Sequence, residues 1–587
     1  MATQTLTEDV RAWLERFSAA LEESDLEKVL ALFGDQCFWR DMVSFTWNVK
    51  TAEGKDEIRA MLEATLPSAA PASWRVEGEA MEMFGAVTAF VAFETATGRG
   101  KGHLRLVDGK CFTLLTTLYE LKGFEEKIGA SRLPGRNLAP EPNRQSWAAK
   151  RELERGELGY GKQPFVVIVG AGHSGVMLAA RLRALNVPTI VVDKGSPGDS
   201  WRNRYGSLHL HTPSYMDNFP YLDYPAGWPT YPSKDEMGDW IEAYVKIMNV
   251  NVWSHSSVES STFDDESKEW AVAVTRPDGK TLTLRPKHLV LCTGMYGDPR
   301  VPDFSGAEIF GGSQHHSSRH GCGGADFAGK KCVVIGTGTS GHDVAQDLWE
   351  KGADVTMVQR SPVFVIRSET LAAVYVDPLF HDSSPMSQQH ADLLMVSTPY
   401  RLVAPFQAPM VEEIKRRDGD LHERLRERGF RVHFAEDGSG LAGLLNRTAT
   451  GYYYNMGASY LIASGEIKVR SGGVEKVTER TVVLTDGSQV PADVIVYATG
   501  SRPVSEVVAR VTSPEVAAKV GPLWGYGSGL DGDPGPWEGE LRNIYKPTAQ
   551  EGLWFHIGGL VQTRFGSLLV ALQLKARFEG LPTPVYR

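Results

Sequence analysis

The sequence predicts an α/β fold with two similar strand–loop–helix–strand units, preceded by a smaller α+β domain. Three observations lead to this prediction. From residue 164 onward, apolar runs rich in Val and Ile alternate with helical patterns, which is typical of buried parallel strands. One glycine pattern, G-x-G-x-x-G, occurs twice between such a run and a helix. Before these units, helical patterns and then a series of alternating strands fill residues 1–130.

Composition narrows the classes of function. The 587 residues exceed what one hydrophobic core serves, so we expect two to four domains. The net charge of −10 argues against a nucleic-acid partner, which needs a basic face. The N-terminus does not have the pattern of a secretion signal, and no apolar run approaches the length of a membrane span. We therefore expect a cytoplasmic protein without a membrane partner.

Cysteine usage fits a reducing compartment. The five cysteines are scattered, and no C-x-x-C pair supports a zinc site, so we expect neither a disulfide framework nor a metal. They are Cys37, Cys111, Cys292, Cys322 and Cys332.

Residues 1–130 have the pattern of an α+β domain. Helices are predicted at 9–21, 26–33 and 54–66, and strands at 37–40, 73–83, 86–97, 100–107 and 110–121. With the W-x-D of Trp39 and Asp41, this order resembles the NTF2-like (SnoaL-like) cone fold. The resemblance implies an enzyme, a ligand pocket or a dimerisation module, and we expect a lid or a homodimer formed through this domain. The proline-rich and then charged segment at 131–162 predicts a linker.

The first glycine loop follows an apolar run at 165–169 and precedes a helical pattern at 176–185. Its glycines suit a Rossmann-type dinucleotide site, because the first makes the turn, the second admits a pyrophosphate and the third lets helix and strand pack closely. The next apolar run ends in Asp193, 18 residues after Gly175, where a carboxylate accepts hydrogen bonds from ribose hydroxyls. The residues predicted at this first site are Gly170, Gly172, Ser174, Gly175, Asp193 and Lys194.

The same layout returns at residues 331–358 with one difference. Eighteen residues after Gly341 stands Gln359, followed by Arg360, so the acid is absent and a cation lies beside its place. An acid repels a 2′-phosphate, whereas Arg binds one through two hydrogen bonds. The first loop is therefore predicted to bind FAD or NAD, and the second to bind NADPH. The residues predicted at this second site are Gly336, Gly338, Ser340, Gly341, Arg360 and Ser361.

Other proteins with glycine loops fit less well. Disulfide reductases place a redox dithiol soon after the first nucleotide unit, and no cysteine lies between Cys111 and Cys292. A kinase-type glycine loop is accompanied by an H-R-D catalytic loop, which the chain lacks.

Residues 164–580 resemble the class B flavin monooxygenases, which include the flavin-containing monooxygenases, the plant YUCCA enzymes and the Baeyer–Villiger enzymes. Besides the paired loops, the segments 198–234, 310–320 and 558–567 and two T-G strand ends carry this resemblance. It implies FAD at the first loop and NADPH at the second. It also adds further cofactor-binding residues: Trp201, Arg202, Thr293, Gly294, Thr499 and Gly500. His320 stands where Baeyer–Villiger enzymes carry Trp, a departure from that subtype.

The resemblance also implies a reaction cycle. NADPH reduces FAD, the reduced flavin traps O₂ as a C4a-(hydro)peroxide, and a small organic substrate takes the distal oxygen. His211 falls where flavin-containing monooxygenases carry an active-site Asn, which implies a catalytic hydrogen bond near the flavin; a histidine satisfied within its loop is the alternative. His316 is interpreted as a residue that couples the domains through the 310–320 strap, with a purely structural histidine as the alternative.

Several questions stay open at this stage. The run at 452–454 (Tyr452, Tyr453 and Tyr454) either walls the substrate pocket or packs in the core. The activity is N- or S-oxygenation or a related hydroxylation, Baeyer–Villiger oxidation of ketones, or a non-oxygenating NADPH oxidase or redox-sensing scaffold. The expected domains are 1–130, a linker at 131–162, the FAD-binding parts at 163–315 and 490–587, and the NADPH-binding domain at 316–489 with an insert at 368–446.

Overall fold

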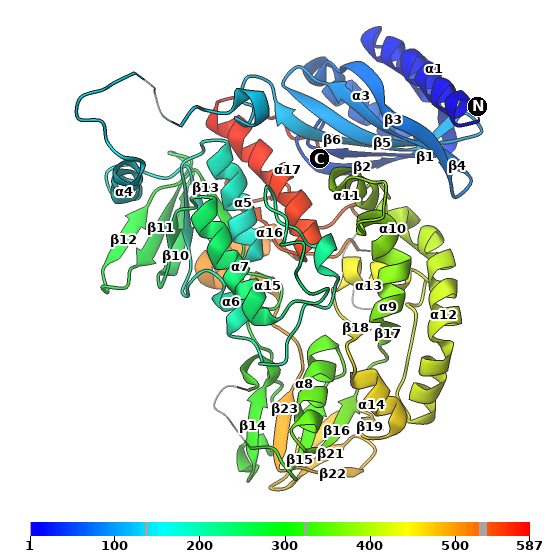
Figure 1. Cartoon of the computed structure of the whole chain (residues 1–587), viewed down its shortest axis with the longest axis vertical. Coiled ribbons are helices and arrows are strands. Elements are labelled where there is room, and N and C mark those ends of the chain that lie inside the picture. Colours follow the sequence, from blue (N-terminus) through cyan, green and yellow to red (C-terminus); the bar gives the residue numbers. More distant parts are fainter. Residues whose placement is uncertain (1, 136–138, 322–325, 528–536) are drawn as a thin grey trace.

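The computed structural model describes residues 2–135, 139–321, 326–527 and 537–587. Cys322 and residues 136–138 of the expected linker lie outside this part of the chain. Figure 1 shows an N-terminal domain at one end, two domains built on parallel sheets, and a helical insert along one side. None of the helices in the described ranges is long and apolar enough to cross a membrane.

The N-terminal domain combines three helices with one six-stranded sheet. The helices are α1 (Ala2–Glu22), α2 (Leu26–Ala31) and α3 (Gly54–Ala69). The sheet has the order β2-β1-β6-β5-β4-β3, in which β1 (Phe33–Met42) and β6 (Lys110–Leu121) are parallel. The remaining strands are β2 (Val49–Glu53), β3 (Ala72–Met83), β4 (Ala86–Glu94) and β5 (Gly98–Val107). The predicted helices and strands are present, β2 is an addition, and the likeness to the NTF2-like cone stays a prediction.

Asp41 and Trp39 lie inside this domain rather than on a pocket wall. Both are fully buried, and Trp39 packs in the aromatic core between the helices and the sheet. The Asp41 carboxylate accepts hydrogen bonds from the Thr46 backbone N–H (2.9 Å), the Thr46 hydroxyl (2.7 Å) and the Thr116 hydroxyl (2.7 Å). A buried carboxylate needs such partners, so Asp41 fixes the turn that follows β1.

The first parallel sheet has the order β24-β13-β7-β8-β9. It is formed by β7 (Val166–Val169), β8 (Thr189–Val192), β9 (Val252–Trp253), β13 (His288–Leu291) and the late strand β24 (Leu553–Phe555). α5 (His173–Ala184) connects β7 to β8, and an antiparallel sheet of β10 (Ser257–Asp264), β11 (Glu269–Thr275) and β12 (Thr281–Leu284) lies beside it. The predicted linker contains the helix α4 (Trp147–Glu157).

The second parallel sheet has the order β14-β23-β15-β16-β19. Its strands are β14 (Ser313–His316), β15 (Lys331–Ile335), β16 (Asp354–Gln359), β19 (Lys468–Ser471) and β23 (Val494–Tyr497), and α8 (Thr339–Glu350) connects β15 to β16. β14 and β23 both pair in this sheet, whereas the expected limits at 315/316 and 489/490 leave most of β14 and all of β23 in the FAD-binding part. We therefore propose domain limits near residues 300 and 500, where the chain crosses between the sheets.

The expected insert is helical. It contains α9 (Ser368–Leu371), α10 (Asp377–Phe380), α11 (Gln388–Val396), the long α12 (Val403–Glu427) and α13 (Gly440–Arg447). Figure 1 shows α12 along the outer edge of the molecule and α11 beneath the N-terminal domain. The insert therefore connects the N-terminal domain with the second parallel-sheet domain.

The second face of the N-terminal sheet is covered within the chain. Phe90, Leu115 and Leu118 pack in one apolar cluster with Leu568 and Leu572 of α17 (Leu560–Phe578), and α11 contributes Leu393. A buried ion pair reinforces this contact: Arg40 Nε lies 2.6 Å from Glu540 Oε1. This sheet face is therefore an internal interface, which leaves it unavailable for the homodimer that we expected through this domain.

Candidate cofactor site

The first glycine loop connects β7 to α5 in the conformation that the pattern predicts. Gly170 has a φ of +110°, and a Cβ there would lie 2.5 Å from the carbonyl oxygen of Cys292, the residue after β13. A Cβ on Gly175 would lie 1.9 Å from the Gly170 carbonyl oxygen. Gly172 is the N-cap of α5 and offers no side chain to its first turn. The helix N-terminus thus keeps room and backbone N–H groups for an anion.

The second loop repeats this geometry between β15 and α8. Gly336 has a φ of +113°, and a Cβ there would lie 2.2 Å from the carbonyl oxygen of Ala498, the residue after β23. A Cβ on Gly341 would lie 2.2 Å from the Gly336 carbonyl oxygen, and Gly338 is the N-cap of α8. The two loops therefore require glycine for the same steric reasons.

Asp193 and Gln359 occupy equivalent positions but differ in their contacts. Asp193 accepts hydrogen bonds from the backbone N–H groups of Ala171 (2.6 Å) and Gly195 (2.7 Å), so its carboxylate lies directly against the first loop. Gln359 is fully buried, and its side chain bonds the backbone of Arg431 in both directions, at 2.7 and 2.9 Å. The residue expected to contact the ribose is thus acidic at the first loop (Asp193) and uncharged at the second (Gln359).

Cations gather at the end of β16. Arg360 and Ser361 are exposed, as is Arg431, whose guanidinium donates a hydrogen bond to the Gln359 carbonyl oxygen (3.3 Å) and a second to that of Arg360. Arg431 was not predicted from the sequence, because it lies 71 residues after Arg360 and no local pattern connects the two. Lys194 is likewise exposed, beside Asp193.

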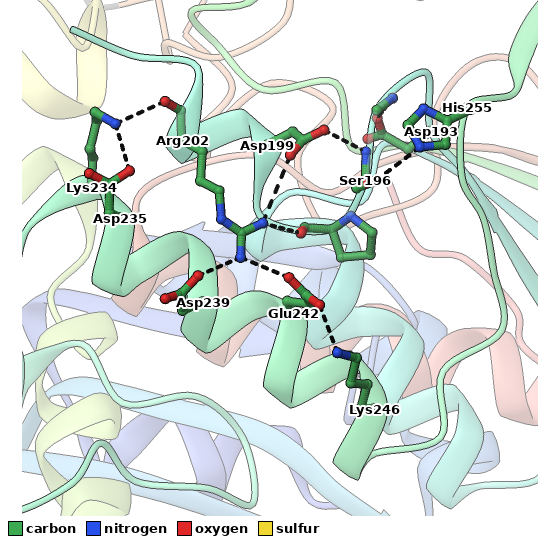
Figure 2. A network of polar contacts seen from close by, with 12 residues as sticks. Asp193, Ser196, Asp199, Arg202, Lys234, Asp235, Asp239, Glu242, Lys246 and His255 are labelled. Carbon is green, nitrogen blue, oxygen red and sulfur yellow. Dashed lines mark hydrogen bonds and ion pairs between the residues drawn. The ribbon is translucent and has the colours of Figure 1, made fainter. Parts of the chain in front are cut away.

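Arg202 belongs to a network with the helix α7 (Lys234–Ile247), which Figure 2 shows. Its guanidinium lies 2.6 Å from Asp239 and 2.8 Å from Glu242, and Lys234 donates a hydrogen bond to the Arg202 carbonyl oxygen at 2.9 Å. Trp201 packs against the apolar core around the first parallel sheet. Arg202 thus holds its segment against α7, and a direct contact from either residue to a cofactor stays a prediction.

The two T-G strand ends lie beside the glycine loops. Thr293 and Gly294 follow the Cys292 carbonyl that faces Gly170, and Thr499 and Gly500 follow the Ala498 carbonyl that faces Gly336. A bridge between Pro299 and Ser501 joins the two crossing segments. The Thr293 hydroxyl is buried and has no hydrogen-bond partner within the described residues, which suits a polar group of a bound cofactor.

His211 contacts the helix α8 in the domain of the second parallel sheet. Its Nε2 lies 3.0 Å from Oδ2 of Asp343, which belongs to the first two turns of α8. The Tyr205 hydroxyl donates a hydrogen bond to the same carboxylate oxygen at 2.6 Å. Burial disfavours a charge on His211, but Asp343 outweighs it and raises the pKa of the imidazole. His211 therefore contacts the domain of the second parallel sheet through Asp343, and no local pattern in the sequence predicts this contact.

His316 and His320 lie in the strap that β14 begins. His316 Nε2 donates to the Gly500 carbonyl oxygen (3.0 Å) and its Nδ1 accepts from the Ser318 N–H (3.1 Å). Burial, with a contribution from Arg204, lowers the pKa of His316 and keeps the ring neutral. Both ring nitrogens are thus satisfied by contacts between the end of β14 and the residues after β23, which fits a structural histidine, and the coupling role stays a prediction.

His320, at the position where the resemblance implies an aromatic residue, packs against one. The ring stacks with Phe327, and its Nε2 lies 2.7 Å from Oδ2 of Asp347, one turn beyond Asp343 on α8. His315 contacts the other nitrogen at 3.2 Å. Among the residues that the structure describes, no group of three His, Cys, Asp or Glu side chains is arranged to hold a metal ion.

The three consecutive tyrosines divide between two faces of β18 (Tyr452–Asn455). Tyr453 is fully buried and stacks on His342 of α8, with ring centroids 3.9 Å apart. Tyr452 and Tyr454 are only partly buried and pack, like Tyr375 of the insert, against a separate apolar cluster. The Thr339 hydroxyl of the second loop donates to the Tyr452 carbonyl oxygen at 3.1 Å. Packing therefore explains Tyr453, whereas the other two face the insert close to the second loop.

Comparisons with known proteins agree with this geometry. A family model described as pyridine nucleotide-disulphide oxidoreductase matches residues 167–383. The indole-3-pyruvate monooxygenase YUCCA1 of Oryza sativa subsp. japonica is 35% identical over 341 residues, which cover 58% of this chain and 77% of that protein. The chain belongs to the class B flavin-dependent monooxygenases. The four described cysteines are free and buried, so within the described ranges this monooxygenase has no redox disulfide.

Solved structures support the fold of this monooxygenase. A crystal structure of cyclohexanone monooxygenase with bound epsilon-caprolactone aligns with a TM-score of 0.50 at 18% identity, covering 71% of this chain and 88% of that one. A structure of OTEMO in complex with FAD and NADP also aligns with a TM-score of 0.50 at 18% identity, covering 71% and 87%. At this identity the similarity concerns the fold.

Proposed function

We propose that this monooxygenase uses NADPH and FAD to transfer one oxygen atom of O₂ to a small organic substrate. One observation carries the proposal: the two loops share their backbone geometry, but Asp193 lies at the first and the exposed Arg360 at the second. A carboxylate accepts hydrogen bonds from the free ribose hydroxyls of FAD, whereas a guanidinium suits the 2′-phosphate of NADPH. This asymmetry supports FAD at residues 170–175 and NADPH at residues 336–341.

The residues of the first site fit this cofactor. Gly172 leaves space at the N-terminus of α5, because a Cβ there would come no closer than 3.5 Å to Ser200, whereas Gly170 and Gly175 allow the turn and the helix to pack closely. The buried Thr293 hydroxyl has no partner within the described residues and offers a polar contact. Bound there, FAD would supply hydride acceptance and, once reduced, the activation of O₂. The protein's own contribution is to bind and orient the two nucleotides and to exclude water from the space between them.

His211 is the proposed hydrogen-bonding residue beside this space. Its Nε2 lies 3.0 Å from Asp343, which raises the pKa of the imidazole, and Nδ1 is the nitrogen proposed for the hydrogen bond near the flavin. If the His211→Ala variant shows unchanged NADPH oxidation and product yield, this role is wrong.

The relatives and the side chains that face the insert bear on the substrate and on the type of oxygenation. The relatives are named for indole-3-pyruvate, an aromatic 2-oxo acid, and Tyr452 and Tyr454 face the insert close to the second loop. His320 stands in place of the aromatic that Baeyer–Villiger enzymes carry, and its pairing with Asp347 gives it a different role. These features favour an oxygenation other than ester formation from ketones.

Isotope incorporation tests the function directly. The enzyme is supplied with NADPH and ¹⁸O₂ and offered a sulfide, an amine, an aromatic 2-oxo acid and a ketone. The proposal expects one ¹⁸O atom in the product of one of the first three, with NADPH consumption coupled to it. NADPH consumption matched by hydrogen peroxide with every compound would identify an oxidase instead.

A further inference from the structure

The helix α8 carries two carboxylates, each of which pairs with a histidine from outside the helix. Asp343 lies 3.0 Å from His211, and one turn later Asp347 lies 2.7 Å from His320. The spacing of four residues places both acids on one face of α8. Both carboxylates are nearly fully buried, with side-chain exposures of 8% and 7%.

We propose that Asp343 is a positioning residue that couples the second nucleotide loop to His211, in the segment that follows β8 of the first parallel sheet. The inference rests on the proposed function. His211 and Tyr205 come from the segment after β8, before the chain enters the second sheet, whereas Asp343 is the second residue after Gly341. One carboxylate oxygen, Oδ2, receives both the Tyr205 hydroxyl and the His211 ring. A buried charge with two such donors has a defined position.

The position of Asp343 near the N-terminus of α8 explains how the second loop is coupled to His211. A dinucleotide phosphate at the second loop binds the N-terminal N–H groups of α8, the same short stretch that holds Asp343. A ligand that fixes this turn therefore also fixes the partner of His211. Thermodynamic linkage makes this coupling reciprocal. If a nucleotide at the second loop stabilises the contact between Asp343 and His211, loss of that contact weakens nucleotide binding by the same factor.

A double-mutant cycle on NADP⁺ affinity tests the coupling. The dissociation constant is obtained from the change in flavin absorbance during NADP⁺ titration of the wild type, Asp343→Asn, His211→Gln and the double variant. Loss of a negative charge near a phosphate acts alike in both backgrounds and cancels in the cycle. Coupling energies of this kind correspond to about 5- to 150-fold, so the effect of Asp343→Asn is expected to differ at least 5-fold with and without His211.

Two further variants separate positioning from a general loss of structure. Asp347→Asn removes the neighbouring acid, whose partner is His320, and its effect is expected to be the same with and without His211. Asp343→Glu keeps the carboxylate and is expected to restore part of the coupling, and Tyr205→Phe provides a second test if Asp343→Asn does not retain flavin. Equal effects of Asp343→Asn in both backgrounds, within 2-fold, would overturn the inference. A flavin-bound wild type that does not bind NADP⁺ would overturn the proposed function as well.

Discussion

Removal of the Arg40 side chain should destabilise the contact between the N-terminal domain and the rest of the chain. Arg40 and Glu540 have side-chain exposures of 5% and 1%, and two nitrogens of the guanidinium bond the two carboxylate oxygens at 2.6 and 2.7 Å. Without Arg40, the buried Glu540 keeps the Thr51 hydroxyl, at 2.7 Å, as a hydrogen-bond donor. An uncompensated buried charge of this kind costs about 3–5 kcal/mol.

The chain offers a matched control for this experiment. Arg401 and Glu53 form another ion pair between the same two parts of the molecule, but their side chains are 51% and 21% exposed. Exposed pairs contribute about 0.2–1 kcal/mol, so Arg401→Ala should shift the urea midpoint far less than Arg40→Met. Replacement of both Arg40 and Glu540 by Met should recover most of the loss, because it removes both charges. Equal, small shifts for Arg40→Met and Arg401→Ala would refute the reasoning.

Two other predictions concern α8 and the second loop. Burial disfavours the charge of Asp347, but hydrogen bonds from His320 and Lys351 outweigh it and lower the pKa of this carboxyl to about 2. A carboxyl whose pKa is lower in the folded than in the unfolded state stabilises the folded state at pH values above the unfolded pKa of 3.8. Asp347→Asn should therefore lower the free energy of unfolding in urea by about 2 kcal/mol at pH 7 and at pH 5. The difference between wild type and variant should shrink as the pH falls from about 4 towards 2. Arg360→Ala should raise the KM for NADPH at least 10-fold without a matching rise for NADH, and Arg431→Ala should raise it less; an unchanged preference would contradict the assignment of the second loop.

Local patterns predicted most of the elements. Most of the expected helices and strands of the N-terminal domain and of both glycine loops agree with the structure within a few residues, because hydrophobic period and glycine positions are properties of short segments. The first helix is an exception, because α1 begins at Ala2 and not at the predicted residue 9. β2 was missed, since it is a five-residue strand after the turn that Asp41 holds. The expected domain limits and the limits that we propose differ because β14 and β23 pair with strands that lie far away in the sequence.

The sequence predicted those site residues that belong to a short local motif. It did not predict those that the fold brings together from distant parts of the chain. Gly170 and Gly336 could be assigned from their spacing, and their positive φ angles give the reason for glycine. Arg431 and Asp343 carry no comparable signal, because their relation to Arg360 and His211 depends on how the insert and α8 pack. The surroundings of Arg202 illustrate the same limit, since its guanidinium binds α7.

The absorbance spectrum of the purified protein, followed by anaerobic addition of a nicotinamide nucleotide, tests the central claim of two unequal nucleotide sites most directly. The structure predicts a yellow protein with bound flavin that NADPH reduces at a lower concentration than NADH, in keeping with Asp193 at the first loop and Arg360 at the second. A colourless protein that acquires no flavin absorbance on incubation with FAD, or a flavoprotein reduced equally well by NADH, would contradict it.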